Sequence, residues 1–236
     1  MEIASKRIGK RNLYRYLSLA DDIDIEESKT AYHNYRSMMR MISELYEFPL
    51  DKTTAAFCAL SPNNDYFGNL RSLVSVLHGL NACIEHERIV ISTYNHCKFR
   101  AISYLLGVHE FVAPERGLKI LSFYQNIMEP ESYDWVTIDG HISAAYNGNP
   151  DATMKESILT KKNYAEIQGV LFEIAKELGE IPNAVQARIW LTRKRVYKIK
   201  HTPNLDMFRE AGDQSGILID PDLIKAYPIK QRLKNG

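Results

Sequence analysis

The sequence has few cysteines, and their arrangement suits neither a metal site nor a set of disulfides. Only Cys58, Cys83 and Cys97 occur among the 236 residues, and no Cys-x-x-Cys pair is present. A zinc or iron–sulfur site built on cysteines is therefore not expected, and no His, Asp and Glu trio has metal-ligand spacing. Because scattered, odd-numbered cysteines fit a reducing compartment, we expect a cytoplasmic protein.

Long apolar runs and nucleotide-binding loops are also absent. No apolar run approaches the roughly 18 residues needed to cross a membrane. The basic N-terminus is not followed by the apolar stretch of a signal peptide. The sequence contains no Gly-x-Gly-x-x-Gly loop, no Walker-type loop and no serine nucleophile elbow. We therefore expect no membrane partner and no cofactor.

The chain has almost no net charge, because 30 lysines and arginines balance 29 acidic residues. The charges are unevenly placed, with basic clusters at 6–15 and 188–200 and an acidic stretch at 21–27. Separate basic clusters can bind phosphates on an otherwise neutral protein. Charge runs more often cover solvated helix faces, so both interpretations stay open.

Apolar residues make up 45% of the chain and recur mostly at helical spacing, which predicts an all-α protein with a sizeable core. Helices are expected at 32–46, at 53–60, from Ser61-Pro62, from Thr93, after Gly117, at 164–178 and from Pro182. The apolar residues of these helices, including Phe99, Ile102, Leu105 and Leu106, are expected to face inward. Short strands are expected only at 196–199 and 217–219.

The segment Val136-Thr137-Ile138-Asp139-Gly140-His141 runs from apolar residues into one carboxylate. A fixed carboxylate can stabilise the cationic sugar formed when an N-glycosidic bond breaks, or orient a nucleophile towards it. The alternative is that Asp139 only caps the helix that starts near His141.

Lys119 lies 20 positions before Asp139 in a segment, Arg116-Gly117-Leu118-Lys119, that opens a helix. A desolvated lysine can attack a sugar carbon as a Schiff-base nucleophile. The alternative is a surface lysine, although a cation is unfavourable at a helix N-terminus. The backbone N–H groups after Arg116 and Gly117 can hold a phosphate.

Two further segments carry polar residues at chain turns. The first, Leu60-Ser61-Pro62-Asn63-Asn64, exposes two amides that can fill the space left by an extruded base, or simply form a capped turn. The second, Tyr94-Asn95-His96-Cys97-Lys98, precedes a helix.

The order and spacing of these four segments resemble the helix-hairpin-helix, endonuclease-III-like DNA glycosylase superfamily. The family's Leu-Ser-x-Gln/Asn, Tyr-Asn-x-x-Lys, Gly-x-Lys and Val-Asp-x-His segments match the segments that contain Asn63, Lys98, Lys119 and Asp139. The resemblance spans roughly residues 50–145. In place of the family hairpin stands Val112-Ala113-Pro114-Glu115-Arg116-Gly117, and the iron–sulfur cysteines of many members are absent, which indicates a divergent branch similar to phage-encoded or phage-defence glycosylase-like proteins.

The resemblance implies a role for each matched residue. Asp139 is the catalytic aspartate, and Lys119 is the Schiff-base lysine of bifunctional members. The implied DNA contacts are Pro62, Asn63, Asn64, Asn95, Lys98, Arg116, Gly117 and Leu118. The implied fold is all-α with two lobes, the central one at 52–130 and the other built from 1–51 and 131–236, with Lys119 and Asp139 facing each other across a cleft.

The sequence thus predicts a monomeric DNA glycosylase that flips a modified base out of double-stranded DNA and leaves an abasic site. The resemblance to the divergent branch implies a bulky modified base, such as a hypermodified cytosine of phage DNA, as the target. The alternatives are a non-catalytic DNA-binding or architectural protein on the same fold, and a helical protein-interaction domain.

Overall fold

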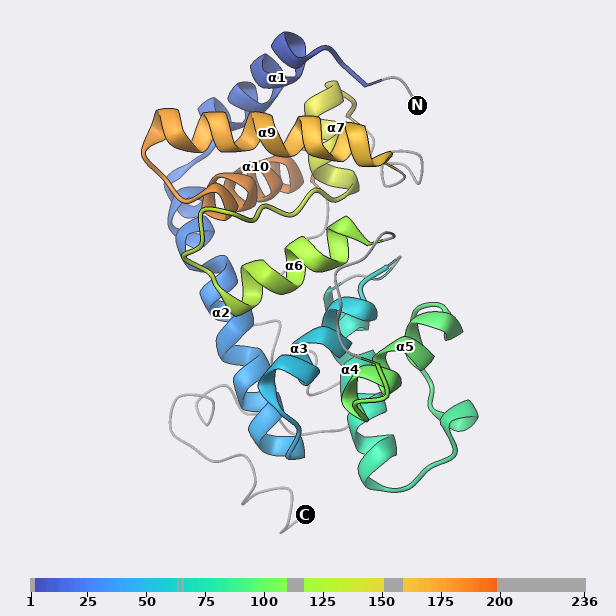
Figure 1. Cartoon of the computed structure of the whole chain (residues 1–236). Coiled ribbons are helices and arrows are strands. Elements are labelled where there is room, and N and C mark those ends of the chain that lie inside the picture. Colours follow the sequence, from blue (N-terminus) through green and yellow to red (C-terminus); the bar gives the residue numbers. More distant parts are fainter. Residues whose placement is uncertain (1–2, 63, 65, 110–116, 151–158, 199–236) are drawn as a thin grey trace. The chain divides into compact units, whose positions relative to one another are not determined.

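The computed structural model describes the chain except for residues 1–2, 63, 65, 110–116, 151–158 and 199–236 (Figure 1). The described residues are predominantly helical and contain no strand, so the predicted all-α class is confirmed. Val196 is the last residue of a helix and not the start of a strand. The strand expected at 217–219 lies outside the described residues. None of the described helices is both long and apolar enough to cross a membrane.

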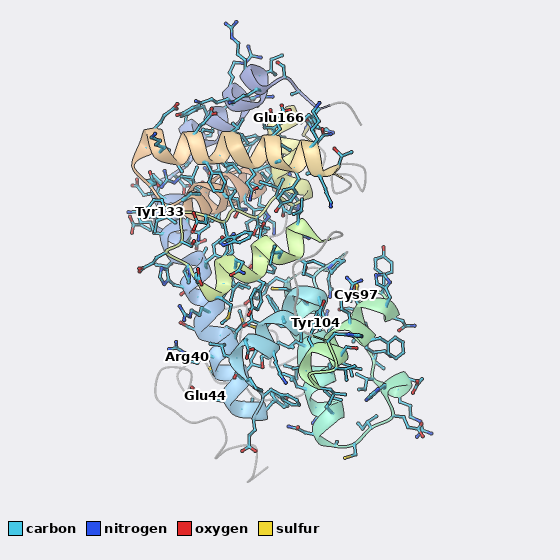
Figure 2. The ribbon with its side chains drawn as sticks, viewed as in Figure 1. Arg40, Glu44, Cys97, Tyr104, Tyr133 and Glu166 are labelled. Carbon is cyan, nitrogen blue, oxygen red and sulfur yellow. The ribbon has the colours of Figure 1, made fainter. Side chains whose placement is uncertain are left out.

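The described chain divides into two compact units, whose side chains are drawn in Figure 2. The first unit contains the described residues up to Tyr35 and from Gly117 onward, and the second those from Arg36 to His109. Asp139 and Lys119 therefore belong to the same unit, whereas the sequence assigned Lys119 to the lobe at 52–130.

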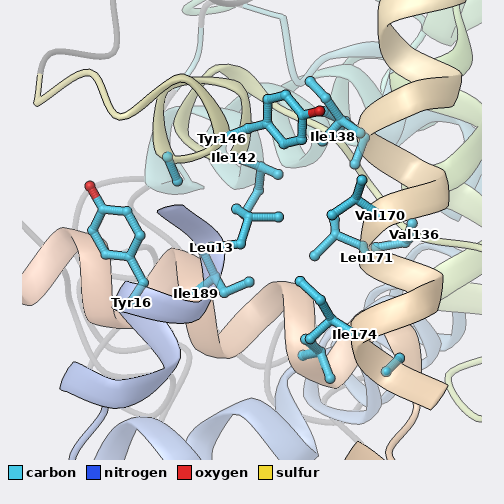
Figure 3. Close-up of a cluster of buried hydrophobic side chains, with 14 of the residues drawn as sticks. Leu13, Tyr16, Val136, Ile138, Ile142, Tyr146, Val170, Leu171, Ile174 and Ile189 are labelled. Atoms are coloured by element: carbon cyan, nitrogen blue, oxygen red, sulfur yellow. The ribbon is translucent and has the colours of Figure 1, made fainter. Parts of the chain in front are cut away.

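The first unit contains α1 (Lys6–Leu19), the start of α2 (Asp22–Tyr46), α6 (Leu118–Met128), α7 (Gly140–Asn147), α9 (Lys161–Leu178) and α10 (Pro182–Val196). Helix α1 packs against α7, α9 and α10. Their apolar faces meet in a buried cluster (Figure 3) whose labelled members are Leu13, Tyr16, Val136, Ile138, Ile142, Tyr146, Val170, Leu171, Ile174 and Ile189. Ile138, directly before Asp139 in the sequence, and Ile142, three positions after it, belong to this cluster, so the chain is anchored in the core on both sides of Asp139.

Helices α9 and α10 follow the sequence signals closely. Tyr164, Ile167, Leu171 and Ile174 form the buried stripe of α9, as the helical spacing predicts, whereas Leu178, expected in the same stripe, is 40% exposed. Gly179 ends this helix in the left-handed conformation at φ +67°, and Pro182 is the first residue of α10. These local signals fix the ends of the two helices that support the site described below.

The second unit contains the rest of α2, α3 (Leu50–Ala59), α4 (Tyr66–Asn81), the short 3₁₀ helix η1 (His86–Arg88) and α5 (Asn95–Leu105). The buried helix expected at 53–60 is confirmed as α3. Ser61-Pro62 does not start the next helix, which begins only at Tyr66. The Thr93 hydroxyl donates to Pro62 O over 2.5 Å, and Tyr94 is the residue that precedes α5.

Phe99 of α5 and Leu106, the residue that follows this helix, are placed differently from the prediction. Ile102 and Leu105 are buried as expected, but Phe99 and Leu106 are 43% and 51% exposed. The buried face of α5 is formed instead by smaller residues and one lysine, namely Cys97, Lys98 and Ala101 together with Ile102 and Leu105. The helix is thus predicted correctly, but two of its four expected inward-facing residues are exposed.

Candidate functional site

Both carboxylate oxygens of Asp139 are held by donors. Oδ1 accepts a hydrogen bond from the backbone N–H of Ile142 over 2.8 Å, so Asp139 caps α7. Oδ2 accepts from the indole Nε1–H of Trp190 on α10 over 3.1 Å. The residue is half-buried, and each carboxylate oxygen has a further lone pair beyond these bonds. The prediction that Asp139 caps a helix is confirmed. The hydrogen bond from Trp190 is not part of the cap, and it fixes the orientation of the carboxylate further.

The extended segment that leads into Asp139 is anchored by Tyr164 of α9. Its hydroxyl accepts from the backbone N–H of Ile138 over 3.1 Å and lies 3.0 Å from Ser122 Oγ and 3.3 Å from Leu118 O. Burial raises the pKa of Tyr164 to about 12, so the phenol keeps its proton at neutral pH. Because Leu118 and Ser122 belong to α6, this one hydroxyl fixes the start of α6 relative to Asp139.

Lys119 is the second residue of α6 and is half-buried. Among the described residues it has no hydrogen-bond or ion-pair partner. Its ammonium lies near enough to His141 to help lower the pKa of that ring. The structure thus brings Lys119, His141 and Asp139 into one electrostatic neighbourhood, although it shows no direct bond between Lys119 and Asp139.

His141 is held as a neutral ring with a defined tautomer. Its Nδ1 lies 2.9 Å from Nη1 of Arg193. Because a guanidinium only donates, Nδ1 must accept, and the ring proton is on Nε2. Burial lowers the pKa of His141, the charges of Arg193, Lys194 and Lys119 act in the same direction, and Asp139 opposes them. His141 therefore has an Nε2–H donor at neutral pH.

Helix α10 supplies three side chains near Asp139 and His141, namely Trp190, Arg193 and Lys194. Arg193 is completely buried, and besides His141 it donates through Nη2 to Asn149 O over 3.3 Å and Pro150 O over 2.5 Å. The Lys194 ammonium lies 4.0 Å from the Trp190 ring centroid, and this ring meets His141 edge-on at 6.2 Å. We call Asp139, His141, Lys119, Trp190 and Arg193 the Asp139 site.

The sequence missed the role of Trp190 and Arg193. It treated α10 as part of a basic cluster, because the partners of these residues lie about 40 to 50 positions earlier in the chain. The available signal was a tryptophan and an arginine three positions apart, which places them on one helix face. Such spacing does not reveal which residues the face contacts.

Four residues of the two basic clusters are ion-paired with acidic side chains. Lys6 and Lys10 of α1 bind Glu173 and Glu177 of α9, and Arg188 binds Glu180. Arg195 binds Asp24 over 2.7 Å and Asp21 over 3.0 Å. The helix-face interpretation therefore accounts for these basic residues, and they give little support to phosphate binding.

The predicted DNA contacts of the second unit are mostly engaged within the protein. Lys98 is 3% exposed and donates to Ile89 O over 2.9 Å and Glu87 O over 3.3 Å, so its ammonium is not available to a phosphate. Asn64 donates to Leu60 O and accepts from Ser92. Pro62 accepts through its carbonyl from Thr93, whereas Asn95 is exposed at the start of α5.

The remaining predicted contacts are Asn63, between α3 and α4 in the sequence, and Arg116, Gly117 and Leu118 around the start of α6. Asn63 and Arg116 lie outside the described residues, as does most of the segment proposed as a hairpin. Gly117 precedes α6, and Leu118 packs against the core of the first unit. Among the described residues, no group of three or more His, Cys, Asp and Glu side chains is placed to hold a metal ion.

The fold and the site define an all-helical protein with an oriented carboxylate at the start of a helix. Comparison of the sequence with family models gives one match, to DUF7178, a family of unknown function, over residues 2–196. The chain belongs to this family. No curated protein and no solved structure matches the chain.

The depressed pKa of His141 predicts a stability loss in mild acid. A histidine whose folded pKa lies below its unfolded value of about 6.5 binds protons more readily when unfolded, so stability falls as pH decreases through this window. His141→Gln keeps an acceptor for Arg193 without titrating. Urea unfolding at pH 7.5 and 5.5 should show a larger loss for the wild type, and equal losses would contradict the assignment.

Proposed function

We propose that this protein is a DNA glycosylase that releases a modified base from double-stranded DNA. The observation that carries the proposal is the Asp139 carboxylate, oriented by Ile142 and Trp190 next to a neutral histidine. The proposed partner, DNA, follows from the resemblance of the four ordered segments to helix-hairpin-helix glycosylases. We further propose that the enzyme acts as a cytoplasmic monomer on a bulky base such as a hypermodified cytosine.

The chemistry of N-glycosidic cleavage suits a fixed carboxylate. As the bond between C1′ and the base nitrogen breaks, the sugar gains oxocarbenium character and the leaving base gains negative charge. An ionised Asp139 stabilises the developing cation, and it needs no reorganisation because two donors already set its orientation. Its free lone pairs can also orient the water that attacks C1′.

His141 and Lys119 have supporting roles in this scheme. The Nε2–H of His141 is suited to donate a hydrogen bond to an oxygen of the departing base, as a neutral donor and not as an acid. Lys119 can instead attack C1′ as the bond to the base breaks, and loss of a proton from its nitrogen with opening of the sugar ring then gives a Schiff base, which permits strand nicking. Where Lys119 does not attack, water completes the reaction and an abasic site remains.

The direct assay uses duplex DNA with a panel of modified bases, including bulky modified cytosines. After incubation, alkali breaks the DNA wherever a base has been lost. Borohydride separates the two chemistries: a covalent adduct that is absent in Lys119→Ala indicates the lysine route, and alkali-labile DNA without an adduct indicates water.

The Trp190→Phe variant tests the orientation of the carboxylate. Phenylalanine retains a ring beside Lys194 and His141 but lacks the N–H that binds Oδ2. We expect about tenfold slower base release, equivalent to roughly 1.4 kcal/mol of transition-state stabilisation. Trp135→Phe is the control, because Trp135 is the other of the two tryptophans and is not part of the Asp139 site. This variant should retain full activity. Equal rates for the two variants would contradict the proposed role of Trp190.

A non-catalytic DNA-binding protein is the second candidate. It is favoured by the cap formed by Asp139, which gives this carboxylate a structural role that needs no catalysis. DNA that shifts on a gel but stays unbroken after alkali, across the whole panel of bases, would support this candidate. Absence of binding even at low salt would instead indicate a protein-interaction domain, because phosphate contacts dominate DNA affinity.

A further inference from the structure

The second unit exposes three aromatic rings within six residues at the start of α5. Tyr94 and Phe99 are 42% and 43% exposed, and His96 is also exposed. The rings of Tyr94 and His96 are stacked nearly parallel, with centroids 5.5 Å apart and an interplanar angle of 10°. We call Tyr94, His96 and Phe99 the α5 aromatic surface.

The packing of α5 against the rest of the second unit does not require these three rings. The helix already has a complete buried face that includes Cys97, Ala101, Ile102 and Leu105. Large aromatic side chains are normally covered, and clustered exposed ones mark interaction sites. The α5 aromatic surface therefore presents aromatic rings that the buried face of α5 does not include.

The charge around the rings selects the kind of partner. Helix α5 contains no acidic residue, and Arg100 lies exposed next to Phe99. The buried ammonium of Lys98 lies 5.5 Å from the Phe99 ring centroid. An aromatic surface with an exposed guanidinium beside it and no carboxylate on its helix fits an anionic ligand with flat rings, and a strand of nucleic acid has both properties.

We propose that Tyr94, His96 and Phe99 form a stacking platform for unpaired bases of a nucleic-acid strand, with Arg100 contacting its phosphate backbone. Stacking on a π face is largely independent of sequence, so the platform would hold bases without reading them. The proposal does not depend on base release at Asp139. A second contact of this kind would assist an enzyme that opens a duplex, because separated bases lose their own stacking partners.

The test is fluorescence anisotropy of a fluorescein-labelled oligothymidylate of about 12 nucleotides with the full-length protein at low salt. Tyr94→Ala, His96→Ala and Phe99→Ala each remove a ring, whereas Tyr94→Phe and Phe99→Tyr retain one. Tyr133→Ala is the matched control, because Tyr133 (labelled in Figure 2) is a tyrosine of the first unit that is 63% exposed. Unfolding temperatures establish that the variants are folded.

Each of the three alanine variants is expected to weaken binding by about 5-fold to 150-fold, while the ring-retaining variants and Tyr133→Ala bind like the wild type. Arg100→Gln is expected to lower the slope of affinity against salt by about one phosphate contact. The proposal is overturned if the wild type does not bind the oligonucleotide, if the alanine variants bind normally, or if Tyr133→Ala weakens binding equally. Base release from duplex DNA is measured separately, so the two proposals can fail independently.

Discussion

Replacing Asp139 with asparagine is expected to slow base release by at least about 10²-fold to 10³-fold, the usual effect of removing one preorganised electrostatic group. The side chains are nearly equal in size, and asparagine is an equally good helix cap, so the bond from Ile142 can be kept. With its oxygen at the cap, the amide would turn its own N–H groups towards Trp190. The variant thus loses the charge and one hydrogen bond and stays folded.

A variant at another helix cap separates catalysis from stability. Thr160 caps α9 in the same unit by accepting from the backbone N–H of Asn163 over 3.1 Å. Thr160→Ala is expected to cost about 1 kcal/mol of stability without slowing base release. Single-turnover rates and thermal unfolding should be measured for both variants. Wild-type rates in Asp139→Asn, or equally reduced rates in Thr160→Ala, would show that Asp139 is only a cap.

Gly9→Ala is expected to destabilise the protein by about 1–3 kcal/mol, the usual cost of forcing a methyl group into a packed core. A Cβ at Gly9 would lie 2.2 Å from two ring carbons of Tyr146. This ring is completely buried and its hydroxyl donates to Glu166 over 2.9 Å, so it has little room to move. The close packing of α1 on α7 therefore requires glycine at this position.

Gly169 provides the matched control for Gly9. It lies in the middle of α9, and no atom comes within 4 Å of a Cβ built there. Gly169→Ala is expected to stabilise the protein by about 0.5–1 kcal/mol, because alanine is the better helix former. Urea unfolding of the two variants should give effects of opposite sign. A Gly9→Ala protein as stable as the wild type would contradict the packing described for Tyr146.

The features predicted correctly from the sequence are those that depend on near neighbours. The buried stripe of α9, its glycine end and the proline start of α10 each follow from residues within one or two turns. The cap formed by Asp139 is also local, because its partner is Ile142. At these positions the local preference and the tertiary packing agree.

The features that the sequence did not predict depend on contacts between distant residues. Thr93 has the chemistry of a helix cap, but its hydroxyl donates to Pro62 O, 31 positions earlier. Trp190 binds Asp139 across 51 positions, and Arg195 binds Asp24 across 171. A run of basic residues looks the same in sequence whether its charges are free or paired. The residues that make up the Asp139 site could therefore be identified only from the three-dimensional structure.

The central claim, that the protein releases a base from DNA, is tested most directly by mass spectrometry of the products. Duplex DNAs that each contain one modified base are incubated with the wild type and with Asp139→Asn, and the small molecules are separated from the polymer. The account predicts a free modified base from at least one DNA with the wild type and little or none with the variant. No free base from any of these DNAs, or equal release by both proteins, would contradict it.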